Sequence, residues 1–322
     1  MKIGFVSENN FLGKVQENAT HLRTEVWWLK CLDAIHINWN KLDEFDLSDF
    51  DIVVFVLSKN NPDYMNKILL FNKNNKIKIG IMQEGPNHLW QEWEMIYQYL
   101  FWRVLDNIDF IFCHNELDKL YFEGISNRLV YILPTMIGTD YINKLPRREK
   151  VDSCIVNGTF CSWYNAGSAF LTIKDIKNIG KIYFPSMGRK KEKEDYFAQV
   201  FSSKDILFLP LMDWSRWMEV LSGMKYAINL MPTLAANSFV LNCACLKIPC
   251  IGDINADVQR TCFPELSINI NNTKKAKELM VRLTEDKEFY ERTVNYAYEK
   301  SKEFDYLNQR PKMMKIIEEI IK

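Results

Sequence analysis

The sequence predicts an α/β protein built from two doubly wound, Rossmann-like domains that face each other across a cleft. Short apolar runs rich in β-branched residues alternate with amphipathic helical patterns, which is typical of parallel sheets covered by helices. The alternation stops at a polar loop over residues 144–150 and then starts again. The chain has 322 residues, more than the roughly 250 at which one hydrophobic core stops growing. We therefore expect an N-terminal domain over residues 1–146 and a C-terminal domain over residues 147–322.

The N-terminal half contains five runs that we expect to be strands. They are nearly continuous in apolar residues, as strands buried on both faces of a parallel sheet are. These runs cover residues 2–6, 51–57, 77–82, 109–113 and 130–134. Helical patterns lie between them, over residues 20–32, 62–71, 90–105 and 116–122.

The C-terminal half repeats this organisation and ends in charged, amphipathic helices from residue 286 onward. Its expected strands cover residues 153–160, 181–188, 205–211, 226–232 and 248–253. Its expected helices cover residues 214–222, 239–246 and 274–283. Ligands of an open α/β sheet bind beyond the carboxyl ends of its strands. Two facing sheets would therefore hold two substrates at one cleft.

Composition narrows the class of protein. The 41 basic and 41 acidic residues leave no basic excess, which removes the simplest argument for a nucleic-acid partner without excluding a local basic groove. No signal-like leader precedes the first expected strand, and no apolar run reaches the roughly 18 residues needed to span a bilayer, so we expect a cytoplasmic protein. The eight cysteines form no Cys-x-x-Cys pair, which favours buried thiols over a zinc or redox site. We expect no metal.

Three segments carry a resemblance to a known family. YILPTMIGTDYINKL places Gly138 and Asp140 in a proline, turn and Gly-x-Asp passage between two lobes. CIVNGTFCSW is similar to the first strand and loop of a donor lobe, and NSFVLNCACLKIPCIGD places Pro249 and Gly252 in a donor-site helix and strand. The chain thus resembles the GT-B fold glycosyltransferases, and within them the retaining family that carbohydrate classifications number four.

The resemblance implies a reaction and its substrates. It implies transfer of a sugar from a nucleotide-diphosphate donor, most simply a UDP-sugar, to an acceptor hydroxyl, with no further cofactor. The acceptor would bind the N-terminal domain and the donor the C-terminal domain. The chain is also similar in layout to the DNA α-glucosyltransferases of T-even phages, whose Gln in the fourth strand has a counterpart at Gln83.

The chain departs from the family pattern at four positions. The two family Glu residues around the donor-site helix correspond to Leu234 and Asn242. The Arg and Lys that neutralise the leaving diphosphate correspond to Thr159 and Tyr164. These departures raise the alternatives of an inverting mechanism and of a catalytically inactive protein that still binds nucleotide sugars.

The donor-binding candidates follow expected strands or open expected helices, where backbone amides and helix N-termini can hold phosphate. They are Gly158, Thr159, Gly188, Asn237, Ser238 and Asn242. Arg189 and Arg216 are the candidate cations that would replace the missing family charges. The plainer interpretations are a tight turn, a helix cap and solvated surface charges.

The acceptor side has four candidates. Glu84 and His88 follow the expected strand over residues 77–82 and could take the proton of an acceptor hydroxyl as a general base. His21 and Trp90 are candidate acceptor-binding residues. Trp90 opens an aromatic stretch whose helical spacing also fits core packing or, with few basic residues, a membrane-surface face.

The sequence leaves the chemical class of the acceptor open. A glycan or a lipid-linked glycan is the default, and a modified base in DNA is the alternative that the phage resemblance suggests. A UDP-sugar epimerase, which shares the two-lobed fold, is a second enzyme hypothesis.

Overall fold

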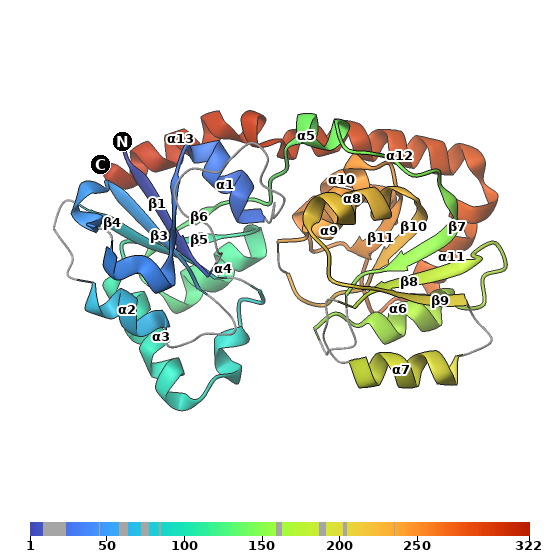
Figure 1. Ribbon diagram of the computed structural model, residues 1–322, viewed down its shortest axis with the longest axis horizontal. Helices are drawn as coiled ribbons and strands as arrows, with labels where there is room; N and C mark the ends of the chain where they lie inside the picture. The colour runs from blue at the N-terminus through green and yellow to red at the C-terminus, as the bar shows by residue number, and fades with distance from the viewer. Residues whose placement is uncertain are drawn as a thin grey trace.

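The computed structural model has two lobes, each built on a six-stranded parallel sheet (Figure 1). The structure describes residues 1–8, 24–44, 46–57, 64–71, 77–83, 85–158, 163–186, 191–201, 205–234 and 236–322. The predicted fold class is confirmed.

The first sheet has the order β2-β1-β3-β4-β5-β6. Its strands are β1 (Ile3–Ser7), β2 (Ile35–Asn38), β3 (Ile52–Leu57), β4 (Lys78–Gln83), β5 (Phe110–Cys113) and β6 (Leu129–Ile132). The helices of this lobe are α1 (Thr24–Leu32), α2 (Tyr64–Leu70), α3 (Met95–Asn107) and α4 (Glu116–Ile125). α5 (Thr139–Asn143) follows at the passage between the lobes, and its Ile142 is buried in the core of the second lobe. Three 3₁₀ turns join them, η1 (Trp39–Glu44), η2 (Leu47–Asp49) and η3 (Leu89–Glu92).

The second sheet has the order β12-β11-β10-β7-β8-β9. Its strands are β7 (Val151–Val156), β8 (Lys181–Pro185), β9 (Asp205–Leu209), β10 (Met224–Asn229), β11 (Cys250–Asp253) and β12 (Ser267–Ile268). Its helices are α6 (Ala166–Ile173), α7 (Lys191–Val200), α8 (Trp214–Ser222), α9 (Ser238–Cys245), α10 (Asp257–Cys262), α11 (Thr273–Glu285) and α12 (Lys287–Ser301). The chain continues through η4 (Pro264–Leu266), η5 (Lys302–Phe304) and the last helix, α13 (Tyr306–Ile321).

All ten predicted strands are present, and each sheet gains one strand that the sequence did not predict. β2 has the sequence IHIN, in which His36 and Asn38 interrupt the apolar pattern, and β12 has only two residues. The predicted helix over residues 90–105 is wrong in one respect, because extended backbone at Trp93 and Glu94 separates η3 from α3. Aromatic spacing continues across this break, which is why the pattern indicated a single helix.

Both faces of the first sheet are covered by helices. Val53 and Phe55 of β3 pack toward α2, α3 and α4, whereas Ile52 and Val54 pack toward α1 and α13. This alternation follows from the two-residue period of a strand. The continuous apolar runs of the sequence are therefore explained by burial on two sides.

The last helix crosses back to the first lobe. α13 packs along α1 beside the N-terminus (Figure 1), with the Trp27 and Tyr306 rings stacked at 5.6 Å. At the crossing, Asp305 caps α13 and accepts hydrogen bonds from the backbone N and Oγ1 of Thr139, at 2.8 and 2.6 Å. The chain thus passes between the lobes twice, and the division at residues 146 and 147 stays a prediction.

Candidate functional site

The carboxyl edges of the two sheets face each other. The amide of Glu116, which follows β5, donates to Asp257 Oδ2, which follows β11, at 3.2 Å. The hydroxyl of Thr135, which follows β6, donates to the carbonyl of Ala236, which follows β10. Both contacts join segments that come after strand carboxyl ends in different lobes. This is the edge at which open α/β sheets bind ligands, so we place the candidate site here.

The second lobe contributes two neighbouring strands, β7 and β10. They pair directly, and Asn157 Nδ2 at the end of β7 donates to Asn229 Oδ1 at the end of β10, at 2.9 Å. α6 follows β7 and α9 follows β10, so both helices begin from this edge.

α6 and α9 begin in the same way. The residue before each is an asparagine in the left-handed region, Asn165 with φ 53° and ψ 31° and Asn237 with φ 53° and ψ 29°. Neither side chain caps its helix. Uncapped first-turn amides carry the positive end of the helix dipole, which favours a phosphate group. Two such N-termini on adjacent strands suit a diphosphate.

Gly158 follows the end of β7 in a conformation that favours glycine. Its φ is +86°, and a Cβ there would lie 2.2 Å from Cγ of Tyr164. The backbone of this turn therefore lies against the Tyr164 ring with no room for a side chain. A donor contact at Gly158 stays a prediction.

Asn242 lies in the buried helix α9 and is itself buried. Ser238, at the first position of α9, is exposed. A donor contact from Asn242 or Ser238 stays a prediction.

Arg216 lies on α8, is more than half exposed and pairs with Glu219 at 2.5 Å. Glu219 also accepts from Arg148 Nε at 3.0 Å. Arg216 and Arg148 thus share one carboxylate on an exposed helix surface, and a role of Arg216 at the diphosphate stays a prediction.

On the first lobe, His88 is exposed and its Nδ1 lies 3.2 Å from Asn87 Oδ1. Trp90 is half-buried, stacks on Phe101 at 5.2 Å and donates from Nε1 to Tyr121 Oη at 2.9 Å. The Trp90 ring thus packs on the core, and an acceptor contact stays a prediction. Five candidates lie outside the described residues, namely His21, Glu84, Thr159, Gly188 and Arg189.

The sequence did not single out a polar cluster at the carboxyl end of β5. Asp118 is buried and accepts from Asn87 Nδ2 and Asn115 Nδ2, each at 2.9 Å. Burial raises the pKa of Asp118 to about 7, although both amides oppose the shift. Burial also lowers the pKa of His114 to about 4, and its Nδ1 has no partner among the described residues. A helix-cap pattern, Asn115 followed three residues later by Asp118, was the available signal.

Gln83, at the carboxyl end of β4, belongs to the same edge. Its Nε2 donates to the carbonyl of Pro86 at 2.8 Å, and its buried Oε1 has no partner in the described part of the chain. Buried polar atoms of this kind at a ligand-binding edge indicate a place where a hydroxylated ligand could bind.

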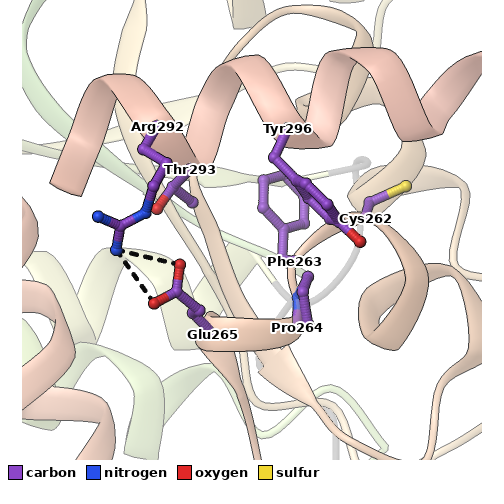
Figure 2. Close-up of a pocket in the computed structure, with 7 residues that line it drawn as sticks. All are labelled: Cys262, Phe263, Pro264, Glu265, Arg292, Thr293 and Tyr296. Carbon is purple, nitrogen blue, oxygen red and sulfur yellow. Dashed lines mark hydrogen bonds and ion pairs between the residues drawn. The ribbon is translucent and has the colours of Figure 1, made fainter. Parts of the chain in front are cut away.

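A pocket of about 170 Å³ lies elsewhere in the second lobe, between the end of α10 and α12 (Figure 2). Its lining is mainly apolar, with Phe263, Pro264 and Tyr296, and its charged pair, Arg292 and Glu265, is already joined at 3.1 Å. α10 leads away from the carboxyl end of β11, so this pocket is not part of the candidate site.

No protein-family model matches the sequence, and no curated protein matches it. Solved structures match closely in architecture. A trehalose-6-phosphate structure from E. coli bound with UDP-2-fluoro glucose has a TM-score of 0.71 at 9% identity and covers 100% of this chain and 99% of its own. Sucrose-phosphate synthase from Thermosynechococcus elongatus has a TM-score of 0.71 at 9% identity, covering 99% and 98%. The chain has the GT-B fold.

Another GT-B neighbour is larger. S. aureus TarM, in complex with fondaparinux, alpha-GlcNAc-glycerol and UDP, matches with a TM-score of 0.68 at 10% identity. The match covers 88% of this chain and 57% of TarM, so this chain spans just over half of TarM.

Within this GT-B fold, the described residues contain no group of three or more His, Cys, Asp or Glu placed to hold a metal ion. No helix in the same part of the chain is long and apolar enough to cross a membrane.

Proposed function

We propose that the protein is a glycosyltransferase that moves a sugar from a nucleotide-diphosphate donor, a UDP-sugar first of all, to a hydroxyl of a glycan or lipid-linked glycan. The paired N-termini of α6 and α9 at one strand edge carry this proposal. They offer two sets of uncapped amides to a diphosphate, in a fold whose solved neighbours include one bound with UDP-2-fluoro glucose.

In this reaction the acceptor oxygen forms a bond to the anomeric carbon while the bond from that carbon to the diphosphate oxygen breaks. The diphosphate leaves with the electron pair, and the helix N-termini stabilise its developing charge. The acceptor proton passes to the leaving phosphate oxygen if configuration is retained, or to Glu84 or His88 if it is inverted.

The two lobes divide the substrates between them. The second lobe holds the nucleotide and diphosphate near Gly158, Asn237 and Asn242. The first lobe holds the acceptor near Gln83 and His88, where its hydroxyls can satisfy the Gln83 oxygen. Contacts between the lobes at Glu116 and Asp257 would help to exclude water from the site.

Thermal unfolding with UDP, GDP, CDP, ADP and their sugars tests the donor assignment. A ligand that binds only the folded protein adds about 2.7 kcal/mol at a hundredfold its dissociation constant. We expect a shift with one nucleotide, lost in Asn242→Ala and kept in Asn66→Ala, a matched change at an exposed position of α2. No shift with any nucleotide at high concentration would overturn the proposal. Binding without release of sugar from the donor would leave the inactive, nucleotide-sugar-binding alternative.

A further inference from the structure

Four side chains form one hydrogen-bond network at the carboxyl ends of β4 and β5. Asn115 caps α4, and its Oδ1 accepts from the backbone N of Asp118 at 2.9 Å. Asn115 Nδ2 donates to Asp118 Oδ2, and Asn87 Nδ2 donates to Asp118 Oδ1, each at 2.9 Å. Asn87 Oδ1 then lies 3.2 Å from Nδ1 of His88. The network thus runs from a helix cap to an exposed imidazole.

The helix cap fixes the orientation of both amides in the network. An amide oxygen accepts hydrogen bonds and an amide nitrogen donates them. Because Asn115 Oδ1 is held by the backbone N–H of Asp118, Asn115 turns its Nδ2 to the Asp118 carboxylate. That carboxylate is buried and accepts at both oxygens. Asn87 therefore turns Nδ2 toward Asp118 and Oδ1 toward His88.

The tautomer of His88 follows from this orientation. Asn87 Oδ1 cannot donate, so His88 Nδ1 carries the hydrogen of their contact. In a neutral imidazole the other nitrogen, Nε2, then keeps its lone pair and accepts. His88 is exposed in the loop after β4, at the sheet edge where the candidate site lies.

We propose that Asp118 and Asn87 are positioning residues, which hold His88 in the Nδ1–H tautomer so that its Nε2 accepts a hydrogen bond from a hydroxyl of the acceptor substrate. This inference rests on the proposed function, because the substrate is the one that receives the sugar. If transfer inverts configuration, Nε2 takes the hydroxyl proton while the oxygen bonds to the anomeric carbon and the diphosphate leaves with the electron pair. The exposed imidazolium then returns the proton to water.

The same loop favours a hydroxylated ligand over a phosphorylated one. Gln83, at the carboxyl end of β4, donates from Nε2 to the carbonyl of Pro86, and its buried Oε1 has no partner among the described residues. Gln83 Oε1 and His88 Nε2 both accept hydrogen bonds, so a hydroxyl satisfies them and an oxygen of a phosphate dianion does not. We therefore expect uncharged sugar hydroxyls at this loop.

Nitrogen-15 NMR of the imidazole rings at pH 8 measures the tautomer and needs no substrate. Asp118 is ionised at this pH, since burial raises its pKa to about 7. The chain has four histidines, and His88→Gln identifies the signals of His88. We expect the unaltered protein to show the hydrogen of His88 on Nδ1.

Asp118→Asn should reverse this tautomer. Asn115 Nδ2 still needs an oxygen, so the new amide at position 118 turns its nitrogen toward Asn87. Asn87 then rotates and presents Nδ2 to His88, which moves the imidazole hydrogen to Nε2. Adding Asn115→Asp supplies an acceptor for the amide nitrogen at position 118, and so restores the Nδ1–H form. Asp106→Asn, the same change at an exposed position of α3, should leave the His88 signals unaltered.

Two results would overturn the inference, namely an Nε2–H signal in the unaltered protein, or one tautomer shared by the unaltered protein, Asp118→Asn and the double variant. If Asp118→Asn fails to fold, Asn87→Ala tests the same step, because it removes the oxygen beside Nδ1 and should move hydrogen to Nε2. UDP should raise the melting temperature of the unaltered protein and of Asp118→Asn alike. An Nδ1–H signal without any nucleotide shift would show that the network is correct and the glycosyltransferase assignment wrong.

Discussion

Asn87 Nδ2 donates a hydrogen bond of 2.9 Å to Asp118 Oδ1, which joins the loop after β4 to the first turn of α4. The loop carries His88, a candidate base, and α4 begins at the contact with Asp257 of the second lobe. A single buried carboxylate thus ties a candidate catalytic loop to the segment that touches the opposite lobe.

Asp118 should make stability fall as pH rises. Its folded pKa, about 7, is raised by burial, so between pH 4 and 7 the folded state holds a proton that the unfolded state has lost. Asp118→Asn removes this effect, which is worth at most about 4 kcal/mol. Urea unfolding at several pH values should show the variant gaining stability relative to the parent as pH rises to 7. Asp106→Asn, an exposed control, should show a flat difference, and a flat difference for Asp118→Asn would contradict the prediction.

His114 should make the stability of the protein rise as pH rises, the opposite of the effect of Asp118. Burial lowers its folded pKa to about 4, so between pH 4 and 6.5 the unfolded state binds a proton that the folded state does not. Stability from this residue is complete above pH 6.5 and is lost as pH falls through that window. NMR titration should show the His114 ring signals constant from pH 8 to 5, and His114→Gln should flatten the acid limb of the unfolding curve. A His114 midpoint near 6.5 would show that the ring is solvated.

Gly158→Ala should destabilise the second lobe. The added Cβ would collide with the Tyr164 ring at a positive φ, which costs about 1 to 3 kcal/mol. Gly124→Ala is the control, since nothing lies within 4 Å of its Cβ on α4 and helical alanine gains about 1 kcal/mol over glycine. The melting temperature should fall for Gly158→Ala and rise slightly for Gly124→Ala. Equal melting temperatures would show that the turn relaxes without cost.

Ile317→Ala should weaken the attachment of α13 to the first lobe. Ile317 is fully buried beside α1, and truncating such a residue costs about 2 to 5 kcal/mol. Lys315→Ala, at an exposed position two residues away, should cost almost nothing. Hydrogen exchange should quicken in α1 and α13 of the Ile317 variant, while α9 stays protected. Faster exchange confined to the second lobe would contradict the assignment of α13 to the first.

The elements that the sequence predicted correctly share one property, which is a strong local pattern. Runs such as IVVFVL in β3 are apolar throughout because both faces of each sheet are covered. α8 begins and ends at the predicted residues because Asp213 caps it and Gly223 follows it. β2 and β12 were missed because a short strand with His36 and Asn38, or with two residues, has no pattern of its own.

The candidate site was only partly predictable. Asn242 could be proposed because it interrupts an apolar segment, Asn237 because it belongs to the polar cluster before that segment, and Gly158 because it follows a strand. The cluster of Asn87, Asn115 and Asp118 could not, because Asn87 is 31 residues from Asp118 and the two meet only when β4 and β5 pair.

The sequence by itself determined the two parallel sheets, since hydrophobic periodicity is local. The apolar residues of each run indicate which faces of that strand are buried. Tertiary structure alone decided which polar side chains leave water, and with that the raised pKa of Asp118 and the lowered pKa of His114. It also decided that α13 returns to α1. These features depend on packing between distant segments, and the free energy of burying a group depends on its neighbours in space.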